Sequence, residues 1–498
     1  MLTGAYRDNY KDTEYDPRRW GLPIGAVYSL GDRLIRVWSR FRDCFKTKTR
    51  DTSDYALTYL RGMLSMERKR NFVNIARRVI GMDDDGQNLQ QFMSDSPWSA
   101  QGVFDRIQAE IIHRDELQGG MLTLDESGDE KAGDKSAGAG RQYLGRIGKV
   151  DMGQVGVALG YYQANVWAMV DAELFLPENW FDEAHKELRE RWHIPADRTF
   201  QSKPNVGIDL IRKAKANGLP FEVVGCDALY GQSSRFRAAL EDEGLIYMAD
   251  IPSDIMVYLT KPVVGIPDAE AGKKGRPPSR PQVLSEDKPV QVKEVVNQPD
   301  FTLQPIQIRH SERGPLIYES FARRVWTVTE QGIVREEWLF IRREADGDFS
   351  YSLSNAGSDT PLARLALWRC ERYFAERIFQ DAKSEGGWDE LVARKYRAWM
   401  HHTALDALAL WFIAETKLDW AQAYPRDPDL ARQLEVEVLP ALSMANVREM
   451  LKAVMPLDQL SPEQAIQIVI QHLVNRSHST RSRLKTKRSN IHNLKRSI

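Results

Sequence analysis

Apolar runs alternate with polar turns over residues 116–250, and the spacing of the apolar positions changes along this stretch. Continuous or alternating apolar residues between turn residues predict strands at 121–124, 155–159, 166–176, 221–226 and 245–249. Apolar residues at helical spacing predict helices at 206–216 and 233–243. The predicted order is therefore β-β-β-α-β-α-β. Three successive strands followed by α/β units indicate a mixed sheet with helices packed against it.

Helical patterns flank this region on both sides. About the first 115 residues are predicted to be helical, and helix returns at Pro361 and continues with breaks to about Leu418, with further helix beyond. Residues 265–299 are rich in Pro, Lys and Gly and predict a linker. Residues 301–354 alternate apolar and polar positions and predict a β-rich segment.

Two stretches concentrate positive charge, although the whole chain has a net charge of −1. Any DNA-binding surface must therefore come from local charge segregation. Residues 61–80 hold six Lys and Arg and one acid, and both a solvated helix face and a DNA-contacting face fit this pattern. The last 23 residues hold eight Lys and Arg and no acid, which fits either a solvated tail or one that lies along phosphates. The candidate DNA contacts in the tail are Arg481, Arg483, Lys485, Lys487 and Arg488.

Composition narrows the class of protein. With 42% hydrophobic and 28% charged residues over 498 positions, the chain is typical of a globular protein with two to four domains. Three widely spaced cysteines without a CxxC pair argue against a zinc site or a disulfide framework and favour a reducing compartment. The first ten residues lack the apolar core of a signal peptide, and no run reaches the roughly 18 apolar residues of a membrane span. We therefore expect a cytoplasmic protein that does not contact a membrane.

Two acidic residues follow predicted strands directly. Asp125 ends the strand 121–124, and Asp227 ends the strand 221–226. Strand ends in α/β proteins meet at one open edge of the sheet, where binding sites usually lie. Phosphodiester chemistry with two Mg²⁺ ions needs about three convergent carboxylates. Glu126 neighbours Asp125 but points to the opposite face of a strand, so it ranks behind Asp125 as a ligand.

A third acid stands out by its spacing. Arg372, Glu376 and Lys383 fall within about 40° of one another on a helix at 100° per residue. The apolar residues between them, Phe374, Ala375, Ile378 and Ala382, fall on the opposite side. This pattern fits a helix that buries one face on the sheet and presents a carboxylate flanked by cations. It also fits an ordinary surface helix with an Arg–Glu pair.

Three segments together resemble the bacterial DDE-class insertion-sequence transposases. The segment from Arg372 to Lys383, RYFAERIFQDAK, is similar to the signature helix of that family, in which Tyr, Arg, Glu and Lys occur at fixed spacing. The position of the Tyr holds Arg369, which is a departure from the family pattern. LTLDESG at 122–128 resembles the strand with the first catalytic Asp, and VVGCDALYG at 223–231 resembles the strand with the second. The similarity extends from about residue 50 to 415.

The resemblance implies a fold, a cofactor and a set of site residues. The expected fold is a ribonuclease-H-like mixed sheet flanked by helices, with a β-rich insertion between the second Asp and the Glu and helical regions at both ends. Asp125, Asp227 and Glu376 would be catalytic and would hold two Mg²⁺ ions, for which Mn²⁺ can substitute, with Asp125 bridging both. Arg372 and Lys383 would contact DNA phosphates beside them.

The insertion in such relatives contacts the transposon end, so aromatic side chains there are candidates for stacking on a flipped base. Trp326 and Trp338 are the candidates in this chain, with the core of a small β-domain as the alternative role for each. Lys203, which precedes a predicted helix, is a further candidate for a phosphate contact.

These patterns divide the chain into five parts. They are a helical DNA-binding region at 1–115, the first part of the catalytic core at 116–250, a β-rich insertion with linker at 251–350, the second part of the core with the Glu helix at 351–420, and a helical C-terminal region with the basic tail at 421–498.

The function expected from these patterns is DNA transposition by cleavage and strand transfer at terminal inverted repeats. The partners would be double-stranded DNA at transposon ends and target sites and a second copy of the chain in a homodimer on that DNA, at the bacterial nucleoid. Three alternatives stay open: a ribonuclease-H-like nuclease without strand transfer, an inactive DNA-binding descendant, and a purely structural helical protein.

Overall fold

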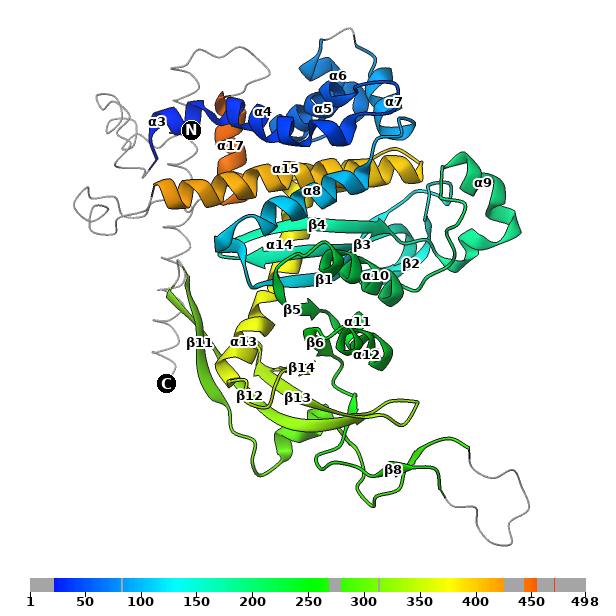
Figure 1. Cartoon of the computed structure of the whole chain (residues 1–498), viewed down its shortest axis with the longest axis vertical. Coiled ribbons are helices and arrows are strands. Elements are labelled where there is room, and N and C mark those ends of the chain that lie inside the picture. The colour runs from blue at the N-terminus through cyan, green and yellow to red at the C-terminus, as the bar shows by residue number, and fades with distance from the viewer. Residues whose placement is uncertain are drawn as a thin grey trace, which may run out of the picture.

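A computed structural model describes residues 22–81, 84–267, 279–311, 314–424, 443–454 and 470 (Figure 1). Its longer helices are α3 (Ile24–Tyr28), α4 (Leu30–Phe41), α5 (Ser53–Ser65), α6 (Phe72–Val79), α7 (Gln87–Ser94), α8 (Ala100–Ile112), α9 (Lys186–Arg191), α10 (Lys203–Ala216), α11 (Ala228–Gly231), α12 (Ser234–Asp242), α13 (Leu362–Glu371), α14 (Tyr373–Asp381), α15 (Tyr396–Ala423) and α17 (Met444–Val454). The strands are β1 (Gly120–Glu130), β2 (Gly140–Leu144), β3 (Lys149–Gln163), β4 (Val166–Leu174), β5 (Phe221–Cys226), β6 (Ile246–Ile251), β7 (Met256–Val257), β8 (Val264–Gly265), β9 (Gln282–Val283), β10 (Val290–Gln291), β11 (Gln304–Ser311), β12 (Gly314–Val328), β13 (Val334–Arg343) and β14 (Phe349–Ser354).

Short helical turns complete the described elements. They are η1 (Arg42–Phe45), η2 (Asp115–Leu117), η3 (Glu178–Phe181), η4 (Glu183–His185), η5 (Val292–Asn297), the π-helical turn η6 (Ala382–Gly386) and η7 (Trp388–Glu390).

The strands predicted from the apolar pattern follow one another along the chain in the predicted sequence and join one central sheet. β4 and β1 flank β3 in antiparallel pairing, and β1, β5 and β6 run parallel to one another. The mixed sheet and its flanking helices are those of a ribonuclease-H-like fold, so the predicted fold class is confirmed. One strand was not predicted: β2 lies in the Gly-rich stretch 133–148 and pairs with the first half of β3.

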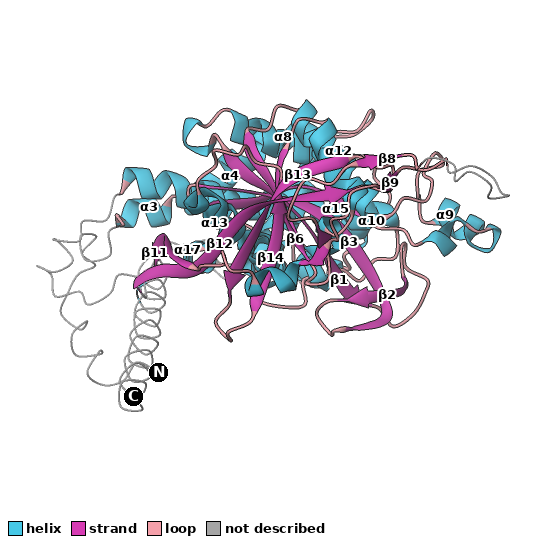
Figure 2. Cartoon of the chain, turned by 90° about the horizontal axis from the view of Figure 1, so that it is seen from below, coloured by secondary structure: helices cyan, strands magenta, loops and turns pink. Residues whose placement is uncertain are grey.

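The insertion is joined edge to edge to this sheet. β14 pairs antiparallel with β6, and β13, β12 and β11 continue outward from it, so one sheet of ten strands runs through both regions. The strands radiate from a common centre when the sheet is seen from below (Figure 2), as the accumulated twist of a long sheet produces. Two small two-stranded sheets, β7 with β10 and β8 with β9, lie beside it.

Helices cover the sheet and stack into a further layer. α15 lies along β4 with α8 at its side, and α5, α7 and α17 pack against α15 (Figure 1). The middle of α15 is buried on all sides, from Ala404 to Ala414. No described helix has an apolar stretch long enough to cross a lipid bilayer.

Half of the six cations in the basic stretch 61–80 lie outside a helix. The predicted helix 55–80 divides into α5 and α6, and Arg68–Arg70 falls in the connection between them. Arg70 is 2% exposed, and its guanidinium donates to the backbone carbonyls of Met66, Glu67 and Ser384. Arg70 therefore anchors this connection in the interior. For this residue, both a solvated helix face and a DNA-contacting helix face are wrong.

Candidate active site

Asp125 and Asp227 lie on neighbouring parallel strands. The last paired residues of β1 and β5 are Leu124 and Cys226, so the two aspartates follow at the same level of the sheet. β1 itself continues to Glu130, so Asp125 stands inside its strand, at the point where the pairing with β5 ends. This differs from the predicted strand exit, because β3 continues to pair with β1 beyond the end of β5.

The local backbone orients the Asp227 carboxylate. Asp227 is the N-cap of α11, and its Oδ1 accepts hydrogen bonds from the backbone N–H groups of Leu229 at 3.0 Å and Tyr230 at 3.4 Å. Capping satisfies backbone donors at the helix start and holds the side chain in one orientation. Oδ2 makes no hydrogen bond among those described, so it is available to a further ligand.

Burial and mutual repulsion disfavour the charged forms of both acids. Burial and the charge of Asp227 raise the pKa of Asp125 to about 7. Burial and the charge of Glu126 raise the pKa of Asp227 to about 6. Arg372 opposes both shifts. Adjacent, half-buried carboxylates of this kind fit a divalent cation, which prefers oxygen ligands and removes the repulsion between them.

Glu376 is carried by α14, which approaches the sheet closely. The four predicted apolar residues of this segment are all buried, as expected: Phe374, Ala375, Ile378 and Ala382. A Cβ on Gly160 of β3 would lie 2.2 Å from Ile378 Cδ1. A Cβ on Gly225 of β5 would lie 3.4 Å from Arg372 Cγ. Gly160 thus makes room for this helix, whereas a Cβ on Gly225 would be in ordinary van der Waals contact with Arg372.

The third acid is linked to the aspartates through an arginine. Arg372 Nη2 donates to Glu376 Oε1 at 3.3 Å, and the Glu376 side chain is 57% exposed. Over the described ranges, no three His, Cys, Asp or Glu side chains are arranged to hold a metal ion. The structure places Asp125 and Asp227 at the same level of adjacent strands, and Arg372, which contacts Glu376, feels the charges of both aspartates.

The signature segment is not one straight helix. α13 ends at Glu371 and α14 begins at Tyr373, so Arg372 lies at the junction, and Lys383 lies in the π-helical turn η6. The predicted single stripe of Arg372, Glu376 and Lys383 is corrected accordingly. Lys383 forms an ion pair with Asp129 of β1 at 3.6 Å.

Glu126 faces the opposite side of the sheet from Asp125, as strand alternation predicts. Its Oε1 forms an ion pair with Lys203 Nζ at 2.8 Å, at the first residue of α10. Its Oε2 is buried without a hydrogen-bond partner. A DNA phosphate would therefore have to compete with the Glu126 carboxylate for the Lys203 ammonium group.

Asp250 is a residue of this site that the sequence reasoning missed. It lies in β6, the next parallel strand after β5, and contacts Arg369 and Arg372 at 2.7 Å each. The signal was present, because Asp250 follows the apolar run 245–249 as Asp125 and Asp227 follow theirs. The same rule about acids at strand ends, applied to this strand, identifies it.

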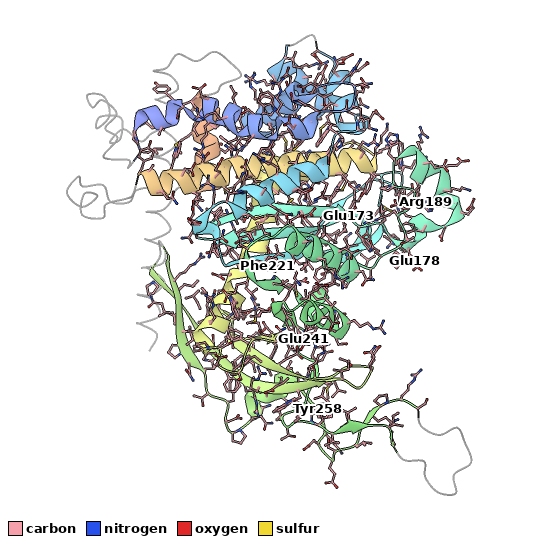
Figure 3. The ribbon with its side chains drawn as sticks, in the orientation of Figure 1. Glu173, Glu178, Arg189, Phe221, Glu241 and Tyr258 are labelled. Carbon is pink, nitrogen blue, oxygen red and sulfur yellow. The ribbon has the colours of Figure 1, made fainter. Side chains whose placement is uncertain are left out.

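The two tryptophans of the insertion differ in their surroundings. Trp338 is half-buried, its Nε1 donates to the Gly357 carbonyl at 3.0 Å, and the Arg324 guanidinium lies 5.1 Å from its ring centre. Trp326 is also half-buried, and its backbone pairs with that of Tyr258, which Figure 3 labels. The tail candidates Arg481, Arg483, Lys485, Lys487 and Arg488 lie outside the described residues.

The parallel strands β1 and β5, with acids at the end of their pairing and an acid on a helix across them, define the class of ribonuclease-H-like nucleic-acid enzymes. A family of "DDE superfamily endonuclease" proteins matches residues 40–315, more than half of the chain, and the chain belongs to this family. The matched range includes Asp125 and Asp227 and ends before Glu376. Enzymes of this family generally use divalent metal ions.

One curated relative adds a more particular likeness. The chain is 31% identical over 209 residues to a protein of Microchaete diplosiphon described as "Probable transposase for insertion sequence element IS701". The alignment covers 41% of this chain and 50% of the relative, so the chain spans about half the length of that protein.

Proposed function

We propose that this protein is a DNA transposase that binds the terminal inverted repeats of an insertion sequence and catalyses cleavage and strand transfer. The observation that carries the proposal is the pair Asp125 and Asp227, half-buried at neighbouring strand positions with raised pKa values in a chain of the DDE family. Family membership supports a nuclease, and the likeness to a probable transposase supports strand transfer.

Asp125, Asp227 and Glu376 are the proposed metal ligands. Two Mg²⁺ ions, or Mn²⁺ in their place, would activate the attacking oxygen and stabilise the leaving oxygen of the phosphodiester. In this proposal the exposed Glu376 side chain exchanges its contact with Arg372 for the ligand position. Arg372 and Lys383 then face DNA phosphates.

The proposed reaction has two stages. Water attacks the phosphodiester at the transposon end and releases a 3′-OH, and that hydroxyl then attacks a phosphodiester of the target DNA. The partners are double-stranded DNA and a second copy of the chain in the DNA complex, in the bacterial cytoplasm. Trp326 is the better placed of the two tryptophans for stacking on a base, because the Trp338 indole is already used by Gly357 and Arg324.

Asp227→Asn tests the proposal directly. The variant should abolish strand cleavage and leave binding of transposon-end DNA within about twofold of wild type, because binding rests on contacts of Lys and Arg with phosphates. Cleavage and strand transfer are followed on labelled duplexes carrying the inverted repeats that flank the gene, and binding by gel shift. Asp242→Asn is the matched control, since Asp242 is an exposed carboxylate at the end of α12.

The outcomes separate the competing functions. Cleavage without joining of the 3′ end to target DNA would favour a nuclease that lacks strand transfer. Binding without cleavage by the wild-type chain, at any divalent ion tested, would favour an inactive descendant. Equal loss of binding and cleavage in Asp227→Asn would indicate a folding defect and would remove the support for this residue.

A further inference from the structure

A buried carboxylate on β6 holds two arginines at once. Asp250 Oδ1 lies 2.7 Å from Arg369 Nε, and Oδ2 lies 2.7 Å from Arg372 Nε. Ser352 Oγ of β14 also donates to Oδ1 at 2.7 Å. The side chains of the three charged residues are 9–12% exposed. Neither Nε–H points squarely at its oxygen, so the two contacts are ion pairs rather than hydrogen bonds.

The cluster of Asp250, Arg369 and Arg372, here called the arginine clamp, is not neutral. Two guanidinium groups face one carboxylate, which leaves a net charge of +1. Burial lowers the pKa of Arg369, and Asp250 opposes this effect. Buried cations without a partner are strongly destabilising, so the carboxylate is needed for both arginines to enter this position.

Arg372 extends from the clamp toward the candidate metal ligands. Its stem lies against Gly225 of β5, where a Cβ would come within 3.4 Å of Cγ. Nε contacts Asp250 on β6, and Nη2 contacts Glu376 on α14. The charges of Asp125 and Asp227 also act on this guanidinium. Arg372 thus contacts Asp250, which is not a proposed metal ligand, and interacts with all three proposed ligands.

We propose that Asp250 is a positioning residue that holds Arg372 back from Asp125 and Asp227 and directs it toward Glu376. The inference rests on the proposed function, in which these three acids bind the metal ions. Released from Asp250, the guanidinium would be drawn toward the two half-buried aspartates, because their charges already act on it. It would then compete with a divalent cation for their oxygens.

The second arginine of the arginine clamp, Arg369, shares the Asp250 carboxylate with Arg372. It occupies the position that holds Tyr in the resembling transposases, and it engages the oxygen of Asp250 that Arg372 leaves free. With one arginine on each oxygen and Ser352 on one side, the carboxylate is held in a single orientation. The departure from the family pattern at Arg369 is therefore compensated by Asp250.

The deciding variant is Asp250→Asn combined with Arg369→Met. The double variant keeps the clamp charge at +1, so it removes the positioning of Arg372 without leaving an extra buried cation. We expect strand cleavage at saturating DNA and Mn²⁺ to fall by about 10- to 100-fold, and Mn²⁺ affinity of the DNA-free protein to weaken by a similar factor, as for groups that orient metal ligands. Binding of end DNA should stay within about twofold.

Arg369→Met alone is the matched control, because it leaves the contact of Asp250 with Arg372 in place. Its Mn²⁺ affinity, measured by calorimetry, should stay within about threefold of wild type, far from the loss expected for the double variant. Wild-type cleavage and Mn²⁺ affinity in the double variant would overturn the proposal and reduce Asp250 to a neutralising group. Arg369→Met as defective as the double variant would overturn it too.

Two further measurements keep the inference separate from folding and from the proposed function. Thermal midpoints are recorded for each variant, and if the double variant does not fold, Asp250→Glu takes its place, since it keeps the charge but moves the carboxylate by one methylene. Wild-type cleavage in Asp250→Glu would then refute the positioning role. If the wild-type chain cleaves no DNA, the proposed function fails, whereas the Mn²⁺ measurement still decides the role of Asp250.

Discussion

At the scale of single residues, the site is a balance between burial and charge. The Asp125 and Asp227 side chains are half-buried, and each feels the charge of another carboxylate. Burial and nearby like charges destabilise the folded protein when these aspartates are ionised. Shifted pKa values of this kind are typical of functional sites. The raised pKa values therefore make the pH dependence of stability a direct measure of this site.

The stability of the metal-free protein should depend on the protonation of Asp125. The folded pKa is about 7 against an ordinary value of 3.8, so between these pH values the folded state holds a proton that the unfolded chain has released. The contribution of this group to stability is therefore lost as pH rises from about 4 to 7, by about 1.4 kcal/mol per unit of pKa difference at most. Asp125→Asn should be more stable than wild type at pH 8 and close to it at pH 4.

Denaturant unfolding in EDTA at several pH values measures this difference. The comparison of wild type with Asp125→Asn cancels the titrating groups that do not interact with Asp125, and Asp242→Asn serves as the exposed control. Added Mn²⁺ should stabilise wild type at pH 8 and have little effect on Asp125→Asn or on wild type at pH 5. A variant that is less stable than wild type at pH 8 would show that the Asp125 carboxylate is compensated within the folded chain.

At the scale of elements, the position of α14 on the sheet is set by what the facing strands lack. Gly160 on β3 leaves space for Ile378, because a Cβ there would lie 2.2 Å from Ile378 Cδ1. Phe374 stacks on Tyr162 of β3 with ring centres 3.8 Å apart. These contacts place Glu376 over the sheet, so the depth at which α14 sits should control activity.

Gly160→Ala should both destabilise the protein and slow cleavage. The added Cβ would lie 2.2 Å from Ile378 Cδ1 and 2.7 Å from Thr123 Oγ1, so α14 must shift or Ile378 must change rotamer. Overpacking of this kind costs about 1–3 kcal/mol. Cleavage should fall more than DNA binding, because the shift displaces Glu376 and leaves distant phosphate contacts unchanged.

Ile378→Val provides the compensating change, because it removes the clashing Cδ1. Alone it should lower stability by about 0.5–1.5 kcal/mol through the lost methyl group. In combination with Gly160→Ala it should recover part of the lost cleavage, and the remainder reflects the contact with Thr123. Strictly additive losses in the double variant, in both unfolding and cleavage assays, would show that the two residues do not meet.

At the scale of the whole molecule, long-range contacts join regions that are far apart in the chain. Glu415 of α15, with its side chain 7% exposed, forms ion pairs with Arg40 of α4 at 2.9 Å and with Arg114 at 2.8 Å. On the other side, β14 joins the insertion to β6, and Arg335 of β13 pairs with Glu241 of α12 at 2.6 Å (Figure 3).

Deletion of residues 476–498 should weaken DNA binding and reduce its salt dependence. The segment contributes eight cations, and each lost phosphate contact lowers the slope of log K against log salt by about 0.9. Discrimination between transposon-end and random duplexes should barely change, since phosphates carry no sequence information. Affinity for both duplexes at several salt concentrations gives the slope. An unchanged slope would make the segment a solvated appendage, and a loss confined to end DNA would assign it sequence recognition.

The sequence by itself determined the order of the core strands other than β2 and singled out Asp125 and Asp227. Apolar periodicity reports local burial, so Phe221–Cys226 was predicted with its observed bounds, and the apolar side of α14 was predicted residue by residue. Family motifs added Glu376, which periodicity alone left open between a site and a surface helix.

Only the tertiary structure decided how the charged residues are used. The burial of Arg70, the pairing of Lys203 with Glu126 and the sharing of Asp250 by two arginines all join residues far apart in the chain. A charged side chain has the same appearance in a sequence whether it faces water, a phosphate or a buried partner. Its role depends on which segment packs against it, and local periodicity carries no record of that choice.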